Sequence, residues 1–122
     1  EPPEGGAQDY RERARKGNPD APIVLNKLAR VLLTAQRPQE AVSHLLHALE
    51  VYPDYSTSHT TLGDVYRHLG ESEKARQHYE HAIQINPFDP LPHRYLAELY
   101  QQSGDTEAAQ REAGVAKRLV GR

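Results

Sequence analysis

The 122-residue sequence contains no cysteine, no methionine and no tryptophan, and it has a single phenylalanine. Without cysteine the chain can form neither disulfides nor thiolate-ligated metal sites, and it has no thiol nucleophile. No apolar run approaches the ~18 residues that would span a bilayer, so we expect no membrane insertion. The 15 basic and 17 acidic residues give a net charge of −2, which provides no electrostatic argument for binding nucleic acid or an anionic membrane surface.

The absence of methionine also indicates that the chain is a piece of a longer protein, because a translation product begins with methionine. Residues 1–6 are rich in proline and glycine and contain no charged-then-apolar leader, so we expect them to be a disordered tail. These features leave the compartment open between cytoplasm and periplasm. The arginine- and alanine-rich composition is a hint of a bacterial origin.

Several residue types recur at intervals of 34 residues. Pro19, Pro53 and Pro87 have this spacing. Two series of alanines and one of leucines share it: Ala7, Ala41, Ala75 and Ala109; Ala14, Ala48, Ala82 and Ala116; and Leu28, Leu62 and Leu96. Four coincident registers predict an internal repeat, in which each unit buries its apolar face against its neighbours.

Residues 56–89 are the most regular unit of this repeat. A first stripe at helical spacing consists of His59, Leu62, Gly63 and Tyr66, and a second consists of Ala75, Tyr79, Ala82 and Ile83. Gly70 suits the left-handed residue after a helix, and Pro87 ends the second helix. Each unit is therefore predicted to be two antiparallel helices, with Gly63 and Ala75 where the helices approach most closely.

This order of residues resembles the tetratricopeptide repeat, whose pattern is W-x-x-L-G-x-x-Y, then A-x-x-x-F, then P, over 34 residues. The resemblance implies an all-α fold, an α-α superhelix that forms a right-handed solenoid of antiparallel helix pairs. It divides the chain into repeats at residues 22–55, 56–89 and 90–122. Residues 7–21 would be part of a preceding repeat or an N-terminal capping helix.

The sequence departs from the family pattern at a few positions. Histidine replaces the first aromatic residue at His59 and His93, and Ala113 stands where the last repeat would have its second aromatic residue. We expect both histidines to be buried, with one ring nitrogen hydrogen-bonded. The helices are expected near residues 22–36, 39–51, 56–69, 73–85, 90–103 and 106–119.

Other histidines raise the question of a metal site. His44 and His47 lie three residues apart, and His78 and His81 occupy the equivalent places one repeat later. Such a pair can face one way on a helix, and imidazole is a common metal ligand. No third ligand follows at a matching spacing, so we expect four histidines that point to solvent, with adventitious metal binding as the alternative.

No arrangement of residues indicates an enzyme. The serines lack ordered acid–base partners, and the glycines form no phosphate-binding loop. Basic residues near the C-terminus suit the last turn of a helix. We therefore predict no catalytic activity, no cofactor and no metal site.

The resemblance implies that the first helix of each pair lines a concave groove, in which members of the family hold an extended peptide or a partner helix. The residues expected in this groove are Asn26, Arg30, Thr60, Asp64, Arg67, Arg94 and Glu98. One subset of the family clamps the terminal carboxylate of heat-shock chaperones, but Asp64 and Glu98 place negative charge where that clamp needs donors. A groove of mixed charge suits a ligand that has charges of both signs.

We therefore predict a scaffold for protein–protein interaction that binds a protein or peptide ligand. One alternative is an accessory domain that positions or regulates a catalytic domain elsewhere in a larger protein, and another is a wall that only spaces other domains. The final helix has Val115, Leu119 and Val120 on one edge, through which we expect weak self-association.

Overall fold

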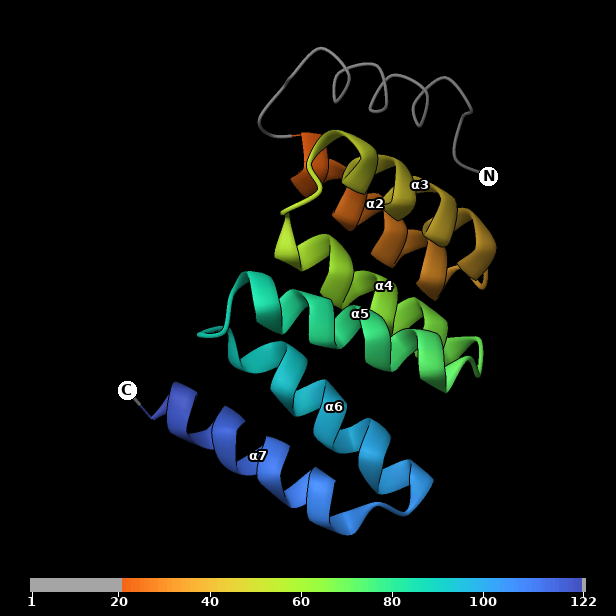
Figure 1. Cartoon of the computed structure of the whole chain (residues 1–122). Helices are drawn as coiled ribbons and strands as arrows, with labels where there is room; N and C mark the ends of the chain where they lie inside the picture. Colours follow the sequence, from red (N-terminus) through yellow and green to blue (C-terminus); the bar gives the residue numbers. More distant parts are fainter. Residues whose placement is uncertain (1–20, 122) are drawn as a thin grey trace.

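The computed structural model describes residues 21–121, and over this range it contains six α-helices and no strand. The helices are α2 (Ala21–Thr34), α3 (Pro38–Val51), α4 (Ser56–His68), α5 (Ser72–Ile85), α6 (Pro90–Ser103) and α7 (Thr106–Val120). Figure 1 shows them as a ladder of antiparallel pairs. The predicted all-α fold is confirmed, and every expected helix agrees with the observed bounds to within two residues. The expectations for residues 1–6 and 7–21 fall, apart from residue 21, outside the described residues.

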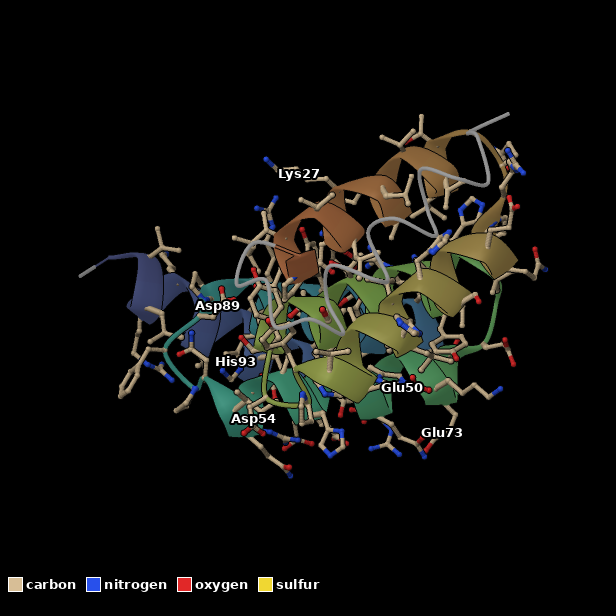
Figure 2. The ribbon with its side chains drawn as sticks, turned by 90° about the horizontal axis from the view of Figure 1, so that it is seen from above. Lys27, Glu50, Asp54, Glu73, Asp89 and His93 are labelled. Atoms are coloured by element: carbon tan, nitrogen blue, oxygen red, sulfur yellow. The ribbon has the colours of Figure 1, made fainter. Side chains whose placement is uncertain are left out.

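The first helices of the pairs line the inner side of the stack. α2 contacts α4 and α4 contacts α6, whereas α3, α5 and α7 do not contact one another. The second helices therefore spread apart on the outer side, and the stack is concave on the side of α2, α4 and α6. In Figure 2, Lys27 of α2 lies on one side of the stack, and Glu50 of α3 and Glu73 of α5 lie on the opposite side.

The core is a narrow strip between the helices, and its largest fully buried side chain is Tyr79. Gly63 of α4 faces this ring. A Cβ atom added to Gly63 would lie 2.5 Å from the nearest ring carbon of Tyr79, so only glycine lets α4 and α5 approach this closely. Ala75 of α5 is also fully buried. The small residues singled out in the sequence thus lie in the packed core of the middle pair.

A left-handed residue turns the chain between the two helices of each pair. Gly70 and Gly104 have φ angles of 78° and 86°, and the equivalent residue of the first pair, Gln36, has a φ of 64°. The left-handed conformation is sterically unfavourable for residues other than glycine, because their Cβ crowds the following carbonyl oxygen. The first pair therefore has a strained turn that the other two avoid.

Candidate peptide-binding groove

Four charged side chains form a row of ion pairs across the concave side. Arg30 of α2 contacts Asp64 of α4, with 3.3 Å between Nη2 and Oδ2. Arg67, one turn further along α4, lies 4.0 Å from the other oxygen of Asp64. Nη1 of Arg67 also donates to Oε2 of Glu98 on α6 at 2.8 Å. The row therefore links the three first helices and alternates in sign along its length.

Asp64 is the buried centre of this row. Its side chain is only 10% exposed, and its Oδ1 accepts a hydrogen bond of 2.5 Å from the Tyr79 hydroxyl. Burial raises the pKa of Asp64, although Tyr79, Arg30 and Arg67 act in the opposite direction. Burial, together with the neighbouring Asp64 carboxylate, raises the pKa of Tyr79, so the hydroxyl stays protonated and remains the donor. The core of the middle pair thus holds the central charge of the groove in place.

A cavity of about 550 Å³ lies beside the row. Its lining consists of Arg30, Leu33, Asp64, Arg67, His68, Tyr95, Glu98 and Gln102. The guanidinium carbon of Arg67 lies 5.4 Å from the centre of the Tyr95 ring, so a cation–π contact and the bond to Glu98 both orient this side chain. The cavity is therefore a polar site built from side chains on rigid helices.

The other residues predicted for the groove lie apart from this cavity. Asn26 and Thr60 are buried, so they offer little surface to a ligand. The Thr60 hydroxyl donates to the Ser56 carbonyl, whereas neither polar atom of the Asn26 amide has a hydrogen-bond partner. Arg94 is exposed and lines a different cavity, beside α7.

Tyr95 is not among the residues that the sequence predicts for this groove. Tyr95 precedes Glu98 by three residues on α6, and residues at this spacing share a helix face. The three-residue spacing from Glu98 was therefore the signal that could have placed Tyr95 in the groove. The residue matters because its ring supports Arg67.

The histidines on the second helices differ from the expectation. His81 is exposed, but His44, His47 and His78 are partly buried, so the prediction that all four point to solvent is wrong. Nδ1 of His78 lies 3.1 Å from Nδ1 of His59, a residue that stands where the family has an aromatic ring. Because an imidazole in that place can hydrogen-bond, the pairing draws His78 inward. No group of three or more histidine, aspartate or glutamate residues within 21–121 is placed to hold a metal ion.

The equivalent contact in the last pair joins a histidine to a carboxylate. Nδ1 of His93 lies 2.6 Å from Oε2 of Glu112. His93 and His59 are both buried and both have a ring nitrogen in a hydrogen bond, as the sequence predicted. Protonation strengthens a histidine–carboxylate contact, whereas two facing imidazoles repel when both are charged.

We expect the protein to lose stability as the pH falls. Burial, with smaller contributions from His59 and His81, lowers the pKa of His78 from 6.5 to about 4. Burial, with a smaller contribution from His81, also lowers the pKa of His59, against the effects of a hydrogen bond to the Pro53 backbone and of Asp54. A histidine whose pKa is lowered by folding binds fewer protons in the folded state, so stability declines as pH falls from the unfolded pKa to the folded one. Urea unfolding should show a loss of about 1–2 kcal/mol across this window after solvent screening.

The variant His78→Glu provides the matched control for this pH dependence. It copies the His93–Glu112 contact into the middle pair, so protonated His59 would gain a carboxylate partner. The acid-induced loss of stability should then shrink or reverse relative to the unmodified protein. An unchanged loss in His78→Glu would show that other groups cause it.

Comparisons with known proteins establish the family of this chain. The family model for tetratricopeptide repeats matches residues 20–87, and a second tetratricopeptide-repeat model matches residues 78–111. The first match spans more than half of the sequence, and the chain therefore belongs to the tetratricopeptide repeat family. The TPR repeat-containing thioredoxin TTL4 of Arabidopsis thaliana is 36% identical over 65 residues, which are 53% of this chain. The match spans 10% of the length of that relative.

Solved structures of other proteins share the fold. MamA superimposes with a TM-score of 0.74 at 23% identity, covering 92% of this chain and 74% of that one. The type III secretion translocator chaperone SycD of Yersinia enterocolitica gives 0.79 at 19% identity, covering 84% and 78%. The CopN-Scc3 complex gives 0.75 at 16% identity, covering 85% and 61%. At these identities the likeness establishes the superhelical fold alone. No helix within residues 21–121 is both long and apolar enough to cross a membrane.

Proposed function

We propose that this chain is a protein-interaction scaffold that holds an extended peptide or a partner helix against α2, α4 and α6. The observation that carries this proposal is the row Arg30–Asp64–Arg67–Glu98 beside a cavity of about 550 Å³. Rigid helices hold these charges on the concave side, so a ligand would meet them without first ordering them. The family and the chaperone and complex among the similar structures support a role in binding proteins.

The exposure of the row indicates the chemistry of the ligand. Arg30 and Glu98, at its two ends, are each about half exposed, whereas Asp64 between them is buried. A ligand would therefore pair an acidic group with Arg30 and a basic group with Glu98. Arg67 and Asp64 lie between these two ends, so the acidic and basic groups of the ligand would be separated by several residues of extended chain.

A second candidate function is an accessory domain in a larger protein. The observation that favours it is the relative from Arabidopsis thaliana, whose name combines these repeats with a thioredoxin and of which the match spans 10%. In that arrangement the groove would position or regulate a catalytic domain of the parent protein. Neither candidate assigns a catalytic step to the described residues.

We expect Arg30→Glu to weaken peptide binding by about tenfold or more, because it replaces the accessible cation with a second negative charge beside Asp64. The probes are fluorescent peptides in which one glutamate and one lysine are separated by different numbers of residues, and the measurement is fluorescence anisotropy. Circular dichroism should show unchanged helix content, because the Tyr79 hydroxyl and Arg67 remain as partners of the Asp64 carboxylate.

Arg94→Glu is the matched control for this experiment. It makes the same charge change on a first helix, at a residue outside the cavity. Binding to this variant should stay close to that of the unmodified protein. Equal losses in both variants, or peptides that bind regardless of the glutamate–lysine spacing, would contradict the assigned site.

A further inference from the structure

The last helix pair contains a largely apolar groove between α6 and α7. A cavity of about 600 Å³ lies there, and its apolar lining includes Pro90, Leu91, Ala97, Ala113, Ala116 and Val120. Val120 is 72% exposed. In the middle pair the residue equivalent to Ala113 is Tyr79, whose ring contacts Tyr95 of the next first helix with 5.8 Å between centroids. The groove therefore lies where the first helix of a following pair would pack.

α2 has the kind of apolar edge that fills such a groove elsewhere in the molecule. Val65 and Leu99 are buried at equivalent positions of α4 and α6, and these helices pack on α3 and α5 of the preceding pairs. The equivalent residue of α2 is Val31, which is 64% exposed. Among residues 21–121, an aliphatic side chain at this position thus lacks the cover that it has in both later pairs.

The charges on α2 and α6, the first and last of the described first helices, are complementary. Within the chain, Arg30 of α2 pairs with Asp64, which occupies the equivalent position of the next first helix. Glu98 occupies that position on α6, and it is half exposed. If an α2 helix followed α6, its Arg30 would lie beside Glu98 at the equivalent position, and Glu98 would then have Arg67 on one side and Arg30 on the other. The row of alternating charge would then continue across the junction.

We propose that copies of this chain stack head to tail, with α2 of one copy in the groove between α6 and α7 of the next. Val31 then packs on α7 of the neighbouring copy, as Leu99 of α6 packs on α5 within the chain. Arg30 pairs with Glu98 of the neighbouring copy. The two surfaces differ, so the contact is heterologous and generates an open array rather than a closed dimer. Successive concave sides join into one longer groove. This inference does not rest on the proposed function, because it is argued from the packing of repeats, although Arg30 and Glu98 at a junction would then pair with each other rather than with a ligand.

The mass of the full 122-residue chain should rise with concentration in sedimentation velocity between micromolar and millimolar protein. Val31→Glu should remove this dependence and leave a monomer, because it places a charge in an apolar junction. Leu46→Glu is the control: Leu46 is an exposed apolar residue on α3, and one repeat later the sequence has Glu80. A chain that is strictly monomeric at millimolar concentration would overturn the proposal, as would equal effects of the two variants.

A cross-linking experiment tests the orientation of the copies. Ala113 lies one repeat after Tyr79, and Lys27 lies two repeats before Tyr95, at the equivalent positions of their helices. The rings of Tyr79 and Tyr95 are in contact, so Ala113 and Lys27 should meet across the junction. The chain has no cysteine, and Lys27→Cys and Ala113→Cys each introduce a single thiol. A short thiol-reactive linker should join these two variants when they are mixed, and should join neither to itself. Links within one variant, or none in the mixture, would overturn the head-to-tail arrangement, and Leu46→Cys mixed with Ala113→Cys provides the background.

Discussion

Replacing Tyr79 with alanine should lower the free energy of unfolding by about 3–5 kcal/mol, the range for removing a large buried aromatic side chain. Tyr79 is fully buried and fills the space above Gly63. Its loss leaves a cavity and also deprives the buried carboxylate of Asp64 of a hydrogen-bond donor. Both effects act in the middle pair, on which the first and last pairs pack. Urea unfolding followed by circular dichroism would measure the change.

Tyr79→Phe separates the two effects. It keeps the ring and removes the hydroxyl, so it should cost about 1–3 kcal/mol, the penalty for leaving one buried polar group unsatisfied. Asp64 would then pair only with Arg30 and Arg67. If the phenylalanine variant were as unstable as the alanine variant, packing of the ring would not be the dominant contribution.

Gly63→Ala should destabilise the protein by about 1–3 kcal/mol, although alanine is the better helix former by about 1 kcal/mol. The added Cβ would lie 2.5 Å from the ring of Tyr79. That ring cannot move aside easily, because it is fully buried and its hydroxyl is bonded to Asp64. The expected result is a lower melting temperature, measured by circular dichroism or calorimetry.

Gly114→Ala is the matched control for this substitution. Its Cβ would meet only the end of the Arg118 side chain, at 3.5 Å, so helix propensity alone should act and stability should rise by up to about 1 kcal/mol. In a Tyr79→Ala background the penalty of Gly63→Ala should disappear, because the opposing ring is gone. A penalty that persists there would show that the steric clash is not its cause.

Local sequence signals were sufficient to predict the helices. Apolar residues at three- and four-residue intervals indicate a helix wherever they occur, and glycine at Gly70 and Gly104 marks the left-handed turns where helices end. The turn at Gln36 lacks this local signal. It adopts the same backbone conformation without glycine, so only the 34-residue period reveals that turn.

The groove was less predictable, because its contacts depend on how neighbouring helices are offset. Spacing along one helix identifies inward positions, but it does not show that Arg67 reaches Glu98 or that Tyr79 reaches Asp64 from the second helix. The burial of His78 depends in the same way on which face of α5 meets α4. Contacts within a helix follow from sequence periodicity, whereas contacts between helices require the three-dimensional arrangement.

Among the described helices, those of the first pair do not contact those of the last. Every helix contact therefore joins segments that are close in the sequence, and the chain can fold without closing a long loop. Such low contact order favours rapid folding. It also means that a helix pair can be inserted or lost without rebuilding a core shared by the whole molecule. The length of the concave surface can therefore change during evolution while the packing of each remaining pair stays the same.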